Sequence, residues 1–194
     1  MSTGLGFTQA GDFLPYLSYN AKAGKFFLNK DKVQTEVTNP TFVANFPAIK
    51  TGWMHFAAGQ APQFVWHPSL SVKAPRPELL GADGKAAYKE GFKVELFSQA
   101  ALGGVVEFSS SSQIVRDALN ALYVAYEAGK ASNPGMLPVV ETAGSTPIKG
   151  KHGTNFSPNF KLVKWVATPA EFSAAKVASN QSVAEAPKAS VSEF

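Results

Sequence analysis

The amino-acid sequence predicts a mainly-β fold with one long helix and a C-terminal tail. Short segments rich in β-branched and aromatic residues recur over residues 7–172, with Gly, Pro and Asn between them. One segment, near residues 113–129, repeats apolar residues at the three-to-four spacing of a helix. The last 22 residues contain no aromatic side chain before the terminal Phe194.

Nine segments have the composition of strands, with turn residues between them. They are Tyr16–Tyr19, Lys25–Asn29, Phe42–Phe46, Gly52–Ala57, Gln63–His67, Gly91–Ser98, Val105–Ser109, Leu137–Thr142 and Phe160–Ala167. Residues 68–88 carry three prolines and the turn pair Asp83-Gly84, so we expect a connection there.

The predicted helix has a single apolar face, formed by Val115, Ala118, Leu119, Leu122 and Tyr126. Ser110 and Gln113 have the spacing of a capping box at its start. Gly129 is expected to end the helix, because glycine readily adopts the left-handed conformation found there.

Several strands, one helix and two more strands form the outline of an OB-fold, a Greek-key barrel of five strands. In that fold the helix lies between the third and fourth strands and plugs the open end of the barrel. Additional strands at the N-terminus would extend the barrel. A β-sandwich with a peripheral helix fits the order of elements less well.

The length of 194 residues suits one domain, which we place at residues 1–172. Residues 173–194 are expected to form a flexible tail, because they offer too little apolar surface to bury. The net charge of +4 lies in residues 1–172, since two Lys and two Glu cancel in the tail. No apolar run approaches a membrane span and no signal pattern begins the chain, so we expect a cytoplasmic protein without a membrane partner.

Several kinds of active site are excluded by the residue types that are scarce. The chain has no cysteine, four Asp and three scattered His, and no paired carboxylates or metal-binding motif. Gly81–Lys85 lacks the spacing of a phosphate-binding loop and is expected to be a turn. We therefore expect a binding protein without a catalytic site, metal or cofactor.

Basic and aromatic side chains alternate in the stretches that we consider as binding surfaces, a pattern typical of single-stranded nucleic-acid binding. In the first, a hairpin turn around Lys22 would bring Lys22 and Lys25 to the end of two strands. Lys25 and Phe27 would share one face of the second strand, and Phe26 the other. Lys93 adds a cation on the outward face of strand Gly91–Ser98.

A second stretch contains two tryptophans. If the strands around Trp53 and Trp66 pair with residue numbers that sum to about 119, these two rings face each other on one side. They would then form a stacking platform or, alternatively, a cross-strand aromatic core. A shift of one residue in this register would separate them.

The third stretch is a flexible Gly/Lys loop that leads into an aromatic strand. Such a loop can close over a nucleic-acid backbone, while the strand supplies further cations and a ring. The alternative is a solvated loop beside the last strand of a barrel. The candidate residues are Lys149, Lys151, Lys161, Lys164 and Trp165.

Three segments carry a resemblance to a known family. FLPYLSYNAKAGKFF (13–27), TGWMHF (51–56) and GTNFSPNFKLVKWVATPAEF (153–172) resemble the single-stranded-DNA-binding proteins of bacteriophages and prophages, which have an OB-fold. The resemblance implies a protein that coats and shields exposed single strands during phage DNA replication and recombination. It also implies that the tail recruits a polymerase, helicase or recombinase of phage or host, through Glu193 and Phe194.

The expected function is therefore non-sequence-specific binding of single-stranded DNA, with lysines on phosphates and aromatic rings under bases. A structural or virion-assembly β protein is the alternative, in which the aromatics are core and the lysines only face solvent. A homodimer is compatible with either function.

Overall fold

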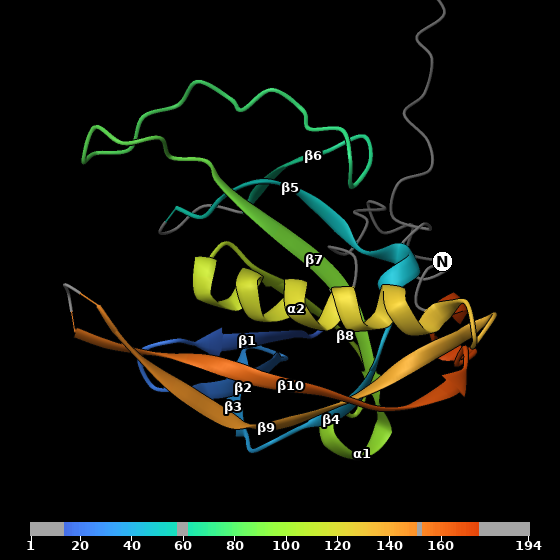
Figure 1. The fold of residues 1–194 in the computed structure, drawn as a ribbon. Helices are drawn as coiled ribbons and strands as arrows, with labels where there is room; N and C mark the ends of the chain where they lie inside the picture. The colour runs from blue at the N-terminus through green and yellow to red at the C-terminus, as the bar shows by residue number, and fades with distance from the viewer. Residues whose placement is uncertain (1–13, 58–61, 151–152, 175–194) are drawn as a thin grey trace, which may run out of the picture.

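The computed structural model describes residues 14–57, 62–150 and 153–174, and these form a mainly-β structure (Figure 1). The strands are β1 (Tyr16–Asn20), β2 (Lys25–Lys30), β3 (Val33–Val37), β4 (Thr41–Ala44), β5 (Lys50–His55), β6 (Gln63–Trp66), β7 (Lys89–Ser98), β8 (Gly104–Ser110), β9 (Met136–Gly150) and β10 (Gly153–Ala167). The helices are η1 (Phe46–Ala48), α1 (Gln99–Leu102) and α2 (Gln113–Lys130).

The strands form one sheet in the order β10-β9-β4-β7-β8-β1-β2-β3, and β5 pairs with both β6 and β7. Because β4 and β5 both pair with β7, they act as two halves of one bent strand. The bend is the turn η1, which contains Pro47; proline lacks the N–H that a continuous ladder would need. The predicted strand Phe42–Phe46 therefore ends earlier than expected.

This arrangement confirms the predicted OB-like class with added strands. Strands β4–β5, β7 and β8 precede α2, and the hairpin β9–β10 follows it. The N-terminal strand β1 lies parallel to β8, so β1–β3 extend the sheet beside the third barrel strand. Over the residues described, no ladder joins β10 to β3, and the barrel is open there.

Strand β3 was not predicted. Its sequence, VQTEV, has only two apolar residues, and four of its five residues are exposed. Its partner is β2 alone, so one of its edges has no strand beside it among the residues described. The two last strands are also longer than predicted, with 15 residues each.

Helix α2 lies across the sheet, and its apolar face is buried as predicted through Val115, Leu119, Leu122 and Tyr126 (Figure 1). Among the residues that the structure describes, no helix is long and apolar enough to cross a membrane. The same face of the helix meets aromatic rings from both halves of the sheet. The helix is therefore the element that covers the open barrel.

The helix begins at the predicted Gln113 and ends one residue after the predicted Gly129, but both predicted caps are wrong. Ser112 is the N-cap and makes no side-chain cap hydrogen bond, while the hydroxyl of Ser110 accepts the N–H of Ser112 at 3.1 Å instead of capping the helix. Gly129 lies inside the last turn rather than after it. A Cβ there would be 2.6 Å from Cζ2 of Trp165, so glycine at this position makes room for the indole ring.

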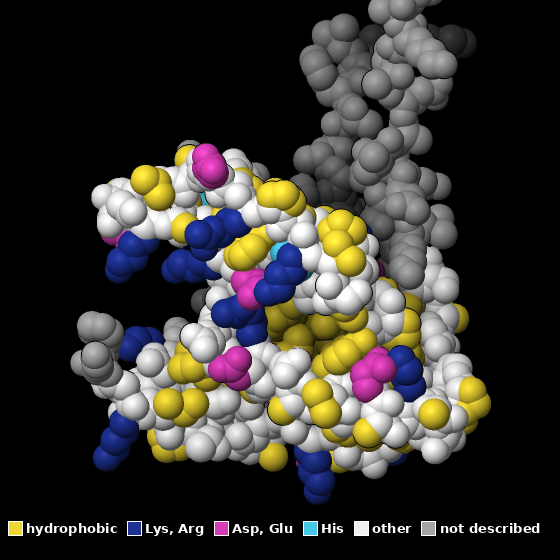
Figure 2. All heavy atoms as spheres, turned by 45° about the horizontal axis from the view of Figure 1, so that its top comes forward, with side chains coloured by type: hydrophobic (Ala, Val, Ile, Leu, Met, Phe, Trp, Pro, Cys, Tyr) yellow, Lys and Arg dark blue, Asp and Glu magenta, His cyan; other side chains and the backbone are white. Residues whose placement is uncertain are grey.

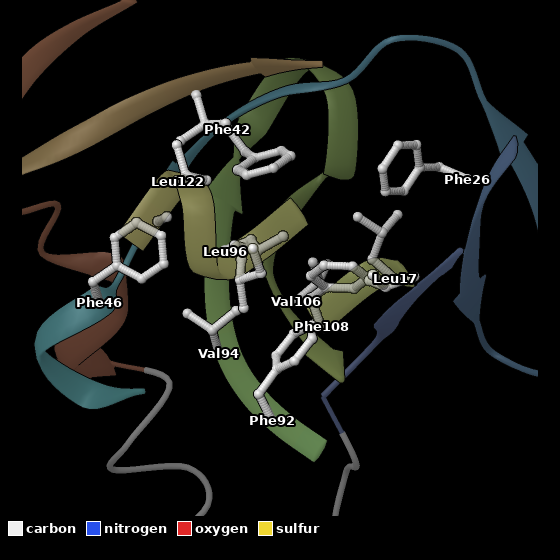
Figure 3. Close-up of a cluster of buried hydrophobic side chains, with 14 of the residues drawn as sticks. Leu17, Phe26, Phe42, Phe46, Phe92, Val94, Leu96, Val106, Phe108 and Leu122 are labelled. Atoms are coloured by element: carbon white, nitrogen blue, oxygen red, sulfur yellow. The ribbon is translucent and has the colours of Figure 1, made fainter. Parts of the chain in front are cut away.

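The core is aromatic, and side chains from β1, β2, β4, β7, β8 and α2 converge in it (Figure 3). The ring of Phe108 lies 5.3 Å from that of Phe92 and 6.2 Å from that of Phe26, measured between centroids. Phe26, and not Phe27, is the buried member of its pair. On β7 the buried set is Phe92, Val94 and Leu96, as the alternation predicts.

The folded unit extends to the predicted domain boundary. Phe172 is 2% exposed, and its ring lies 6.1 Å from that of Phe97. The predicted flexible tail begins at Ser173, and residues 175–194 lie outside the described part of the chain.

Phe108→Ala should lower the free energy of unfolding by about 3–5 kcal/mol, because it leaves a cavity where three rings meet. Phe64→Ala, on an exposed strand, should cost less than about 1 kcal/mol. Chemical denaturation of both variants checks this, and equal losses would contradict the placement of the core.

Candidate nucleic-acid interface

Residues 67–88, here called the arm, leave β6 and return to β7 along a path that stands away from the sheet (Figure 1). Its base is fixed to β5. The backbone N–H of His67 donates to the carbonyl of Thr51 at 2.9 Å, and the indole N–H of Trp53 donates to the carbonyl of Ala74 at 2.8 Å. The guanidinium of Arg76 lies 5.6 Å from the centroid of the Trp53 ring. Trp53 thus anchors the arm, and a cation covers its ring.

The far end of the arm is a small ordered turn. Leu80 and Ala86 form a bridge, and the N–H of Gly81 donates to the carbonyl of Lys85 at 2.7 Å. Gly84 has φ +70°, a conformation that favours glycine. The turn predicted for Gly81–Lys85 is confirmed, and the prolines of the arm account for the lack of longer ladders.

Two adjoining cavities, of about 390 and 680 Å³, lie between the base of the arm and α2. We call them together the groove. Figure 2 shows a hollow with a hydrophobic floor and with Lys and Arg side chains around it. The basic residues that line the groove are Lys50, Lys73, Arg116 and Lys130, and the acidic ones are Glu90, Asp117 and Glu127. His67 and Tyr123 line both cavities.

Glu90 connects three elements at one side of the groove. Its carboxylate lies 2.6 Å from Nζ of Lys73 on the arm and 3.0 Å from Nη1 of Arg116 on α2. The hydrogen bond from Lys73, ahead of the Coulombic attraction of both cations, lowers the pKa of Glu90. The arm is thereby held to the helix through a carboxylate on β7.

Tyr123 presents a neutral hydroxyl and a ring at the groove. Burial is the largest cause that raises its pKa to about 12, and a hydrogen bond to Glu127 adds to it. Its ring meets that of Phe46 edge-on at 5.4 Å. The wall of the groove is therefore an uncharged aromatic at any physiological pH.

The predicted pairing of Trp53 with Trp66 is wrong by one residue. Trp53 faces Val65 and Trp66 faces Gly52, so the two indoles lie on opposite sides of the hairpin. A Cβ at Gly52 would be 2.9 Å from Cα of Trp66, a close approach that only glycine allows. Trp66 instead stacks on Phe64, with centroids 5.0 Å apart and planes 10° apart.

The first predicted surface lies on the outer side of the sheet. Lys25 and Phe27 point away from buried Phe26, and Lys93 points away from Val94. Two of these cations are matched by carboxylates: Nζ of Lys25 lies 2.9 Å from Glu36, and Lys93 pairs with Glu107. Lys22 lies in the β1–β2 turn, where its N–H donates to the side chain of Asn20 at 2.9 Å.

The third predicted surface is divided between exposed lysines and a packed ring. Lys149, Lys161 and Lys164 are exposed and make no ion pair with the described residues. Trp165 instead packs on α2, with its ring 5.6 Å from that of Tyr126. The prediction that Trp165 is an open platform is thus corrected, because the space left by a glycine in the helix receives the indole. Lys151, Glu193 and Phe194 lie outside the described residues.

Sequence reasoning missed most of the groove, namely His67, Lys73, Arg116 and Tyr123. The sequence shows two cations in the arm, Lys73 and Arg76, but the composition of this Pro-rich segment gives no sign that it is ordered. The spacing of residues along the sequence does not show which face of α2 the arm contacts.

The groove can bind anions and flat apolar rings, since it combines cations with aromatic walls. Within residues 14–57, 62–150 and 153–174, no three His, Asp or Glu side chains lie close enough to hold a metal ion.

Acid should loosen the arm through Glu90. Because the pKa of Glu90 is lowered in the folded protein, its stabilising contribution is present above the ordinary value of 4.5 and is lost as pH falls through the lowered pKa. The indole N–H resonance of Trp53 should then shift in NMR spectra. In Glu90→Gln it should already be shifted at neutral pH. Glu78→Gln, on the exposed arm, is the control, and an unshifted Glu90→Gln spectrum would rule out this attachment.

Comparisons of the chain with protein-family models, curated proteins and solved structures find no match.

Proposed function

We propose that this protein binds single-stranded DNA without sequence preference, in the groove and along the arm. One observation carries the proposal: a groove lined by aromatic rings, and by four cations against three carboxylates, lies beneath the connection between the first and second barrel strands. In OB-folds, oligonucleotides bind near that connection and the one between the fourth and fifth strands. In this protein the first of these connections is residues 56–88, and the second is the end of the β9–β10 hairpin, which carries Lys149.

Two cations at the groove and on the arm have no carboxylate partner among the described residues. Lys50 lines the groove and makes no ion pair with the described residues, and Arg76 meets a ring instead of a carboxylate. The arm carries three Lys and Arg against two acidic residues. On the outer face, Lys25 and Lys93 have carboxylate partners, as Lys73, Arg116 and Lys130 have in the groove.

Aromatic rings next to the groove would stack bases. Trp66 lines the larger cavity, and Phe64 beside it is 37% exposed. Phe56, 51% exposed, meets Phe64 edge-on at 6.0 Å. Stacking of a base on such a ring contributes about 1–3 kcal/mol and tolerates any sequence.

Binding of oligo-dT, followed by fluorescence anisotropy between 50 and 300 mM salt, tests the proposal. The affinity should fall steeply with salt, because the strand releases its counterions when cations replace them. The double variant Lys50→Ala/Lys73→Ala should weaken binding and reduce the salt slope by about 1.4, because each of the two lost phosphate contacts contributes about 0.7.

The matched control is Lys25→Ala/Lys161→Ala, which removes the same charge from the outer face. It should change the affinity much less than the groove variant. A larger loss of affinity in this control than in the groove variant would place the interface on the outer face instead. The proposal fails if the wild-type protein does not bind oligo-dT at 50 mM salt, or if it binds duplex DNA equally well. Either result would favour the alternative of a structural or virion-assembly protein.

We propose in addition that the tail docks a replication partner, through Glu193 and Phe194. Deleting residues 175–194 should leave the affinity for oligo-dT nearly unchanged, because the groove lies wholly in residues 46–130. The same deletion should abolish capture of a polymerase, helicase or recombinase from the host of the phage. The substitution Phe194→Ala is the finer variant. Capture that survives the deletion would remove this role.

A further inference from the structure

Strand β3 has an edge that no described strand covers, and its hairpin shows which backbone groups lie along that edge. The two residues of the β2–β3 turn, Asp31 and Lys32, have φ of 52° and 64°, as a two-residue hairpin turn requires. The residues that flank such a turn form a hydrogen-bonded pair, and hydrogen-bonded and non-hydrogen-bonded pairs alternate along the ladder. Counted from the turn, Gln34 and Glu36 belong to the non-hydrogen-bonded pairs. Their N–H and C=O groups therefore point away from β2, toward the uncovered edge.

The side chains beside this edge leave its backbone accessible. The amide of Gln34 donates to the side chain of Asn29 at 3.2 Å, and a carboxylate oxygen of Glu36 lies 2.9 Å from Nζ of Lys25. Both side chains are thus held toward β2. The strand contains no proline or lysine, and its register with β2 has no bulge. Edge strands commonly carry such features to prevent pairing with another chain, so this edge lacks the usual protection.

We propose that β3 pairs antiparallel with β3 of a second copy of this chain, about a two-fold axis at Thr35. In this register Gln34 of each copy faces Glu36 of the other, and all five residues of the strand are paired. Gln34 and Glu36 then form two hydrogen-bonded pairs, because their backbone groups already point outward. No other assembly is needed to satisfy this edge.

The two neighbouring registers that also match outward backbone groups are less favourable. If Glu36 faced Glu36, like charges would lie directly opposite each other, which is destabilising. If Gln34 faced Gln34, Glu36 would fall opposite Lys32, a turn residue with positive φ that cannot continue the ladder. The sequence of β3 therefore complements itself best about Thr35.

The other face of the paired strands would bring apolar side chains together. Val33, which is exposed, would lie opposite Val37, and Thr35 would lie opposite Thr35. Cross-strand pairs of β-branched side chains stabilise a sheet. One pair of five-residue strands nevertheless buries less than a standard interface of about 1,600 Å². The dimer is therefore reversible and dissociates on dilution.

A proline at position 34 tests the assignment, because the N–H of Gln34 points to the edge and not to β2. Gln34→Pro removes this donor from both copies and leaves the ladder between β2 and β3 its own hydrogen bonds. Gln34→Ala is the matched control, since it also loses the contact with Asn29 but keeps the backbone donor. A thermal melt of each variant checks that the fold is intact.

Sedimentation velocity over a dilution series, without DNA, measures self-association. The wild type and Gln34→Ala should dimerise reversibly, and Gln34→Pro should raise the dissociation constant about tenfold or more, as expected for two lost hydrogen bonds. A dimer that persists unchanged in Gln34→Pro would overturn the assignment to β3. A monomeric wild type would overturn the dimer, and dimers that then appear only after deletion of residues 1–13 would identify that segment as the occupant of the edge. None of these results depends on the proposed binding of DNA.

The register is tested by disulfide formation, which the cysteine-free chain allows without background and which does not require the proline variant to fold. Opposite Cα atoms of a non-hydrogen-bonded pair lie about 4.5 Å apart, within the range that a disulfide spans. Thr35→Cys should therefore form a covalent dimer on mild oxidation. Val33→Cys is the control, because its two copies would be about 13 Å apart. It should cross-link only when mixed with Val37→Cys, and cross-linking of Val33→Cys alone, without that of Thr35→Cys, would contradict the register.

Discussion

The structure depends on a cluster of aromatic rings that holds together strands with no shared ladder. Phe160 on β10 lies 6.2 Å from Phe26, 6.4 Å from Phe42 and 6.4 Å from Phe108, measured between ring centroids. These rings come from four strands spread over the whole domain. Where the barrel is open between β10 and the N-terminal hairpin, ring packing replaces the missing ladder. The hydrogen bond from the N–H of Phe156 to the carbonyl of Ala21, at 2.7 Å, reinforces it.

A few polar contacts hold the arm in position beside the core. The Trp53 indole holds its base, and Glu90 joins it to α2 through Lys73 and Arg116. The same cations that fix the arm also line the groove, so order in the arm and the electrostatics of the groove are coupled. A phosphate that approaches Lys73 competes with a carboxylate that is about one-third exposed and therefore only partly protected from solvent.

The two faces of the sheet differ in how far their charges are balanced. On the outer face, Lys25 and Lys93 face Glu36 and Glu107, which limits any attraction for phosphate. In the groove, Lys73, Arg116 and Lys130 also have carboxylate partners, while Lys50 makes no ion pair with the described residues. Alternate residues of each strand face the core or the surface, which determines where the charges of the sheet lie. The arm is not a strand, so it adds a surface that this alternation does not predict.

The sequence by itself determined the mainly-β class, nearly every strand, the helix and its buried face, because these depend on local composition and periodicity. It also placed Phe92, Val94 and Leu96 on one face. Only the tertiary structure decided between Phe26 and Phe27, separated Trp53 from Trp66, and put Trp165 on the helix. Registers and ring positions depend on contacts between distant segments, as at Gly52 and Gly129, where a missing Cβ admits an indole. The groove arises in the same way, since Lys73 on the arm and Arg116 on α2, more than 40 residues apart in the chain, meet at the carboxylate of Glu90.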